Sequence, residues 1–310
     1  MTLTQLSYIV AVDKYRHFAT AAEKIYVTQP TLSMQIHKLE EELGVKIFDR
    51  SKSPVVPTEI GITIIEEAAR ILRQARVIED TARLSDGSIR GTFRIGVIPT
   101  IAPYLIPLFL SSFVNKYPEA ELVFEELLTS DILARLSGDT LDAGIIATPP
   151  GQNTIYTEDL YTEPFVGFLS LSHPLAESER LTAENLENQD IWLLNEGHCL
   201  REQTLKLCKK QKQNGNLSIR FESGNLETLK KLVEQNFGMT LMPFLSVHDF
   251  DKSYSKAVIK EFSDPVPGRK VRLAYGRKFL KQNMIKAFKE DILENLPVEL
   301  DSGSRKIVLE

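Results

Sequence analysis

The chain has few residues of the kinds that bind metals, and it lacks the long apolar runs that cross membranes. Its 310 residues include two cysteines and five histidines, which form no C-x-x-C or H-x-x-x-H pattern. We therefore expect neither a metal nor another cofactor. The apolar run Tyr8 to Val12 is closed by Asp13 and Lys14, which is unlike a secretory signal. With so little cysteine, a cytoplasmic protein without a membrane segment is expected.

Charge of either sign is not in large excess. The net charge of −5 does not indicate binding to nucleic acid, and residues 1–90 hold 12 basic and 12 acidic side chains. Any contact with DNA must therefore depend on where a few cations are placed. The chain has room for two or three domains, and 43% hydrophobic residues is ordinary for a globular protein.

Three short helices are expected at the N-terminus, at residues 4–15, at 19–25 and from about Pro30 to Leu43. Pro30 suits the first turn of the third helix, whose apolar stripe is Leu32, Ile36, Leu39 and Leu43. The second helix of such a helix-turn-helix reads base edges in the major groove. Two β-prone pieces at 46–48 and 55–56 flank a basic loop and predict a wing. The alternative is a three-helix packing unit with a solvated polar face.

The expected DNA contacts divide into two kinds. We expect Gln29, Thr31 and Ser33 to read bases, while Arg50 and Lys52 hold phosphates. The full set of expected contacts is Gln29, Pro30, Thr31, Ser33, Lys38, Arg50 and Lys52.

Isoleucine and alanine recur at alternating intervals of four and three between residues 59 and 82. The seam is Ile64, Ala68, Ile71, Ala75, Ile78 and Ala82. It favours a dimerising helix, which would supply two reading helices to a two-fold DNA site; a helix packed on its own domain is the alternative. Gly87 and Gly91 then indicate a hinge. The expected parts are a winged helix-turn-helix over 1–58 and a linker helix with hinge over 59–90.

These 90 residues resemble the winged helix and linker helix of LysR-type transcriptional regulators. The resemblance is carried by Ala19, Ala21, Ala22, Thr28 to Ser33, Ile36, Leu39, Glu40, Leu43 to Val45, Phe48, Arg50, Thr58 and Gly61. The chain departs from the family before Thr58, where Leu is usual. The resemblance implies a regulator that binds promoter DNA as a homodimer, assembles into a homotetramer and works with RNA polymerase.

After Thr92 the pattern alternates between strands and helices, which indicates α/β architecture. A second set begins near Pro164, so the fold class is α plus α/β with a two-lobed effector domain of the periplasmic-binding-protein type. Strands are expected at 190–194, 218–222 and 239–242, among others. The expected lobes are 91–162 with 266–298 and 163–265, followed by a flexible tail at 299–310.

Two threonines follow expected strands at their carboxyl ends. Thr100 follows the strand 93–98 and Thr129 follows 121–126, and such positions form the mouth of an open sheet. Ordinary N-cap or turn duty is the alternative for each.

Both cysteines lie on one expected helix, 200–210. Cys199 stands at its N-terminus near His198 and Arg201, where the helix dipole favours a thiolate. Cys208 shares a face with Thr204 and is expected to pack inside. Nine helical steps put the two side chains on opposite faces, about 13.5 Å apart along the axis. A disulfide allows about 7 Å between Cα atoms, so bonding them would require the helix to unwind. Two buried, inert thiols are the alternative.

The whole chain is most similar to the peroxide-sensing members of the LysR-type family. This resemblance rests on Gly96 to Thr100, Pro103 to Leu105, Glu196 to Arg201, Gln203, Cys208, Leu226 to Leu229 and Gly238 to Pro243. It implies that Cys199 reacts with hydrogen peroxide and that Cys208 is its disulfide partner. It further implies a peroxide pocket formed by Thr100, Thr129, His198 and, through a looser alignment, Arg269. Glu202 replaces a usual Asp.

The implied function is activation of oxidative-stress genes, reset by a thiol reductant of the glutaredoxin or thioredoxin type. One alternative is a LysR-type regulator that binds a small metabolite between the lobes. A thiol peroxidase is the other, but it would leave residues 1–90 without a role, so we expect no enzyme.

Overall fold

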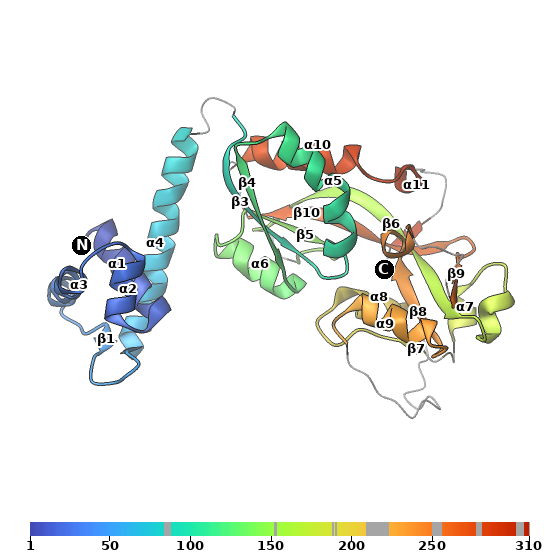
Figure 1. The fold of residues 1–310 in the computed structure, drawn as a ribbon, viewed down its shortest axis with the longest axis horizontal. Helices are drawn as coiled ribbons and strands as arrows, with labels where there is room; N and C mark the ends of the chain where they lie inside the picture. The colour runs from blue at the N-terminus through green and yellow to red at the C-terminus, as the bar shows by residue number, and fades with distance from the viewer. Residues whose placement is uncertain are drawn as a thin grey trace. The chain divides into compact units, whose positions relative to one another are not determined.

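The computed structural model describes residues 1–83, 88–151, 154–187, 189, 191–208, 223–249, 256–276, 281–301 and 307–309. The chain divides into two compact units, Met1–Asp86 and Gly87–Glu310. Helices and strands carry the labels of Figure 1.

The N-terminal unit is a winged helix-turn-helix. Its elements are α1 (Leu3–Tyr15), α2 (Phe18–Lys24), α3 (Gln29–Leu43), β1 (Phe48–Asp49), β2 (Val56–Pro57) and α4 (Glu59–Arg83). The predicted stripe of α3 is confirmed at Leu32, Ile36 and Leu39, which are fully buried, whereas Leu43 is exposed. The first wing strand begins two residues later than predicted, at Phe48; the N–H groups of Ile47 and Phe48 both donate to the side chain of Glu40.

The seam predicted along α4 divides in two. Ala68 is buried with Ile65 in the core that α1 and α3 build. Ile71 and Ile78, by contrast, are 39% and 72% exposed. The first turns of α4 therefore pack on their own unit, as the alternative held, while later turns keep exposed isoleucines.

A curled mixed sheet runs through the C-terminal unit, in the order β4-β3-β5-β10-β6-β8-β7, with β9 on β6 and β11 on β10. Its strands are β3 (Gly91–Val97), β4 (Ala120–Glu126), β5 (Ala143–Ile146), β6 (Tyr156–Ser170), β7 (Ile191–Trp192), β8 (Met239–Pro243), β9 (Ala257–Lys260), β10 (Val266–Tyr275) and β11 (Ile307–Leu309). The helices are α5 (Ala102–Lys116), α6 (Thr129–Ser137), α7 (Ala183–Leu186), α8 (Cys199–Leu207), α9 (Leu226–Glu234), α10 (Gln282–Glu294) and α11 (Val298–Asp301), with 3-10 turns η2 (Pro174–Glu177) and η3 (Phe244–Val247).

Two apolar cores define the two lobes. In the first, Phe288 of α10 meets Phe93, Phe109 and Phe113 edge to face. The second gathers β6, β8, α8 and α9 and includes the fully buried Phe168. Strand β6 belongs to both lobes, because it pairs with β10 along its first half and with β8 and β9 along its second. The predicted two-lobed α/β fold is confirmed.

The prediction that a strand begins near Pro164 is wrong at its start, since β6 begins at Tyr156. Proline lacks an N–H and interrupts a strand pattern. Here Pro164 lies opposite Gly268 of β10, and the next residue, Phe165, already lies opposite Pro243 of β8. The proline therefore occupies the point where the strand changes partner.

The C-terminal end also differs from the prediction. The expected flexible tail includes α11 and β11, and β11 pairs in parallel with β10. Helix α8 ends at Leu207. The expected strand 218–222 lies outside the described residues. Within the described ranges, every helix is too short or too polar to span a bilayer.

Candidate functional site

Both cysteines are free thiols, one at each end of α8. Cys199 is the first residue of the helix and is partly buried, whereas Cys208 directly follows its last residue and is 3% exposed in the second lobe's core. The predicted helix between them is confirmed. The two sulfurs cannot bond while α8 is intact, because its axial length exceeds the reach of a disulfide.

Arg269 is the charged centre of the site. It is 1% exposed on β10, directly opposite Glu163 of β6. Its Nε donates to Glu163 Oε2 at 2.8 Å, and its Nη1 and Nη2 donate to the hydroxyl and carbonyl oxygens of Thr100 at 2.8 and 3.0 Å. Glu163 also accepts the N–H of Leu245 at 2.9 Å. The ion pair therefore ties the loop after β3 to the strands that join the lobes.

The thiol of Cys199 is under opposing influences. Burial raises its pKa, whereas the charge of Arg269, the N–H groups of Leu200 and Cys199, and the Thr129 side chain lower it; the net pKa is raised. The expectation of a low pKa from the helix N-terminus is therefore wrong for this closed, reduced form, because burial outweighs the local dipole. Arg201 is not among the groups that lower the pKa of Cys199, and its guanidinium donates to the carbonyl of Leu194.

His198 lies beside the cysteine in sequence, and its ring approaches Gly224. A Cβ atom added to Gly224 would lie 3.3 Å from Nε2 of His198. The ring caps no backbone N–H of α8. Burial lowers the pKa of His198, so it is neutral near pH 7. The structure thus brings Cys199, Arg269, Thr100 and Thr129 together but does not place the His198 ring among the groups that shift the thiol.

Neither threonine serves as a helix cap. Thr100 precedes the N-cap residue of α5, Ile101, and its hydroxyl accepts from Arg269. Thr129 is the first residue of α6 after Leu128, and its buried hydroxyl has no hydrogen-bond partner other than the Cys199 thiol, whose pKa it lowers. The N-cap part of the alternative is wrong for both, whereas Thr100 does lie in a turn. The Thr129 hydroxyl remains available to a small polar ligand at the sulfur.

Three polar residues of this region were not predicted as site residues, although Gln203 was part of the family resemblance. Glu163 and the buried hydroxyl of Tyr161, which has no hydrogen-bond partner, lie two positions apart on β6. Gln203 lies one turn after Cys199; its amide donates to the carbonyl of Ala147, and its Oε1 is buried without a partner. The four-residue spacing on α8 could have found Gln203. No local signal marks Glu163, whose partner is 106 positions away.

The exposed face of α3 is the candidate nucleic-acid interface. Gln29, Pro30 and Lys38 are exposed there, and Thr31 and Ser33 are partly exposed. A shallow surface groove is lined by Pro30, Ser33, Met34, His37, Lys38 and Glu41. The N-cap Thr28 bonds the N–H of Thr31, so the first turn of α3 is fixed in place.

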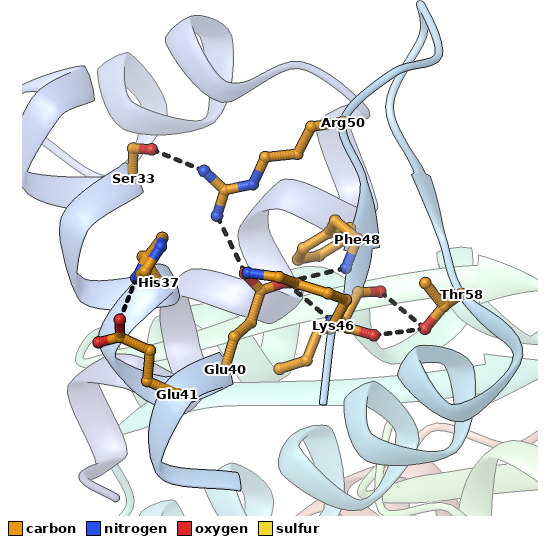
Figure 2. Close-up of polar contacts among 9 residues, drawn as sticks. Ser33, His37, Glu40, Glu41, Lys46, Phe48, Arg50 and Thr58 are labelled. Carbon is orange, nitrogen blue, oxygen red and sulfur yellow. Dashed lines mark hydrogen bonds and ion pairs between the residues drawn. The ribbon is translucent and has the colours of Figure 1, made fainter. Parts of the chain in front are cut away.

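The two predicted phosphate contacts differ in their surroundings. Lys52 is 65% exposed and lies 3.8 Å from Asp49. Arg50 is turned inward: it donates to Ser33 Oγ at 3.0 Å and lies 3.3 Å from a carboxylate oxygen of Glu40 (Figure 2). The guanidinium of Arg50 is therefore held within the unit. Of these two side chains, only Lys52 projects its positive charge into solvent.

Comparison with known proteins places both units in one family. Residues 3–62 match the model described as "Bacterial regulatory helix-turn-helix protein, lysR family", and residues 86–297 match "LysR substrate binding domain". The chain belongs to the LysR family of DNA-binding transcription regulators.

Several relatives of this chain carry a more particular description. This chain is 34% identical to the hydrogen peroxide-inducible genes activator of Haemophilus influenzae, over 89% of this chain and 90% of the relative. A full-length OxyR variant from Pseudomonas aeruginosa has a TM-score of 0.76 at 34% identity and covers 96% and 99% of the two chains. A hydrogen-peroxide-bound OxyR mutant from Corynebacterium glutamicum has a TM-score of 0.63 at 29% identity and covers 95% and 92%.

Proposed function

We propose that this protein senses hydrogen peroxide through Cys199 and activates oxidative-stress genes. The observation that carries the proposal is a partly buried thiol at a helix N-terminus, acted on by the charge of a fully buried arginine and by a buried threonine hydroxyl that has no other partner. Relatives named as peroxide-inducible activators and a relative with peroxide bound support it.

The first chemical step is attack of the Cys199 thiolate on one oxygen of peroxide. The S–O bond forms as the O–O bond breaks, which gives a sulfenic acid and hydroxide; the hydroxide takes a proton and leaves as water. Donors from Arg269 and Thr129 would stabilise the charge that develops on the leaving oxygen. Thr100 acts through Arg269, which it holds by two hydrogen bonds.

The second step requires α8 to open. Burial raises the pKa of Cys208 to about 11, so this thiol is almost entirely protonated while it is packed in the core. Only the thiolate is a good nucleophile. Release of the helix would expose Cys208, lower its pKa and let it displace hydroxide from the sulfenic sulfur, giving a disulfide and water. Each oxidation thereby changes the second lobe.

Reduction by two thiol electrons would break the disulfide and let α8 reform. We propose a reductant of the glutaredoxin or thioredoxin type and a cytoplasmic setting in which such reductants act. The thiol chemistry then serves signalling and not turnover, so the protein is not an enzyme.

The output of the switch is promoter binding by an oligomer. We propose that the exposed Ile71 and Ile78 of α4 contact a second copy, that dimers assemble into a homotetramer, and that the oxidised form works with RNA polymerase. Two copies of α3 would then read a two-fold related site.

The test is a titration of the full chain with one equivalent of peroxide, followed by thiol counting, with Cys199→Ser as the variant. Wild type should lose two thiols and change its affinity for its own promoter, whereas Cys199→Ser should do neither. Two intact thiols in treated wild type would contradict the proposal and favour a regulator that responds to a metabolite.

A further inference from the structure

A chain of contacts joins the buried side of the wing to the exposed face of α3. Nη1 of Arg50 donates to Ser33 Oγ at 3.0 Å, and Nη2 lies 3.3 Å from Glu40 Oε2 (Figure 2). The guanidinium carbon lies 4.8 Å from the centre of the Phe18 ring. Three neighbours therefore fix the direction of the guanidinium.

Glu40 is the buried end of this chain. It is 2% exposed, and its Oε1 accepts the N–H groups of Ile47 and Phe48 at 2.8 and 3.2 Å. The wing backbone thus holds the carboxylate, and the carboxylate holds Arg50. The position of Arg50 relative to α3 is set by the fold of the wing and not by the DNA.

We propose that Arg50 is a positioning residue that fixes the hydrogen-bond polarity of Ser33. A serine hydroxyl has one hydrogen to donate and two lone pairs that accept. The guanidinium donates to one lone pair, so the hydroxyl hydrogen turns away from Arg50. The positive charge also disfavours the approach of another N–H group. Ser33 therefore acts as a donor toward whatever enters the groove that it lines.

This polarity selects among bases and rests on the proposed reading of DNA by α3. In the major groove guanine presents two acceptors, N7 and O6, whereas cytosine presents an amino donor. Adenine carries one acceptor beside a donor, and thymine one acceptor beside a methyl group. Ser33 with Arg50 behind it is therefore suited to a guanine edge and unsuited to a cytosine edge.

The experiment compares the full wild-type chain with Ser33→Ala, Arg50→Lys and their double variant, by selection from a random duplex library and titration of single duplexes. Ser33→Ala and Arg50→Lys should relax the preference for guanine at the same base pair, each by about 2- to 10-fold. The double variant should lose no more of the guanine preference than either single variant does. Replacing that guanine by 7-deazaguanine should weaken wild type and leave Ser33→Ala unchanged.

The matched control is Lys52→Ala, which removes an exposed cation from the same loop. It should weaken binding to all duplexes alike and lower the slope of log affinity against log salt concentration by about one. Arg50→Lys keeps its positive charge and should keep this slope.

Two outcomes would overturn the proposal. In one, Arg50→Lys weakens every duplex equally; in the other, the guanine preference survives in Ser33→Ala. A wild-type chain that selects no sequence at all would overturn reading by α3 itself. If Arg50→Lys does not fold, Ser33→Ala and the 7-deazaguanine duplex still decide the role of Ser33.

Discussion

Arg269 and Thr100, 169 positions apart, are joined by two hydrogen bonds, from Nη1 to the hydroxyl and from Nη2 to the carbonyl oxygen. The threonine comes from the loop after β3, and the arginine from the strand β10 that runs through both lobes. A charge that acts on Cys199 is therefore held by the framework between the lobes.

The two threonines of the pocket predict opposite effects on stability. Thr100→Val would leave an N–H of buried Arg269 without an acceptor, which should cost about 1–3 kcal/mol in unfolding free energy. Thr129→Val removes a buried hydroxyl that has no partner beyond the weakly bonding Cys199 thiol, so its unfolding free energy should stay within about 1 kcal/mol of wild type or rise. Urea unfolding of both reduced variants measures this.

The same pair separates stability from chemistry. Thr129→Val should still slow the reaction of Cys199 with peroxide, by about tenfold, because a donor to the leaving oxygen is lost. Stopped-flow oxidation is the measurement. Equal destabilisation of the two variants, or an unchanged rate in Thr129→Val, would show that the Thr129 hydroxyl has another role.

Cys208 predicts a loss of stability at alkaline pH. The folded protein holds its proton more tightly than the unfolded chain, because burial raises the pKa from 9.0 to about 11. The associated stability is complete below about pH 9 and is lost as the pH rises toward 11, up to roughly 2–3 kcal/mol. Between pH 8 and pH 11, the unfolding free energy of reduced wild type in urea should fall by this amount more than that of Cys208→Ala. If the unfolding free energies of the two proteins fell in parallel with pH, the burial of the thiol would be contradicted.

The exposed isoleucines of α4 predict where subunits meet. Ile71→Glu and Ile78→Glu should lower the sedimentation coefficient and the DNA affinity together, because a charge cannot be buried in an apolar seam. Glu67→Gln, at another exposed position of the same helix, is the control and should leave both unchanged. An unchanged assembly in the glutamate variants would place the subunit contact elsewhere.

The sequence predicted those features that depend on local spacing. The stripe of α3 and the helix between the cysteines follow from residues a few positions apart, and both are present. Strand β6 was missed at its start, because Pro164 interrupts the pattern that predicts a strand. In three dimensions that proline lies where the strand changes partner, which no local pattern reveals.

The contacts and pKa values of the site residues were harder to predict than the identity of those residues. The pairing of Arg269 with Glu163 depends on the register of β6 against β10. The raised pKa of Cys199 depends on burial, which the local helix dipole does not indicate. Arg50 was predicted to hold a phosphate, and only the folded wing shows that Ser33 and Glu40 hold its guanidinium.

The central claim is that oxidation joins the two ends of α8 and thereby unfolds it. The direct measurement is mass spectrometry of the full chain after mild peroxide, with disulfide mapping and hydrogen exchange read on peptides from Leu200 to Leu207. The account predicts an intramolecular bond between Cys199 and Cys208 together with much faster exchange over these residues, while Cys208→Ser stops at a sulfenic acid or mixed disulfide and keeps slow exchange. A disulfide with unchanged exchange would contradict the unfolding of α8, and the absence of that disulfide would contradict the switch itself.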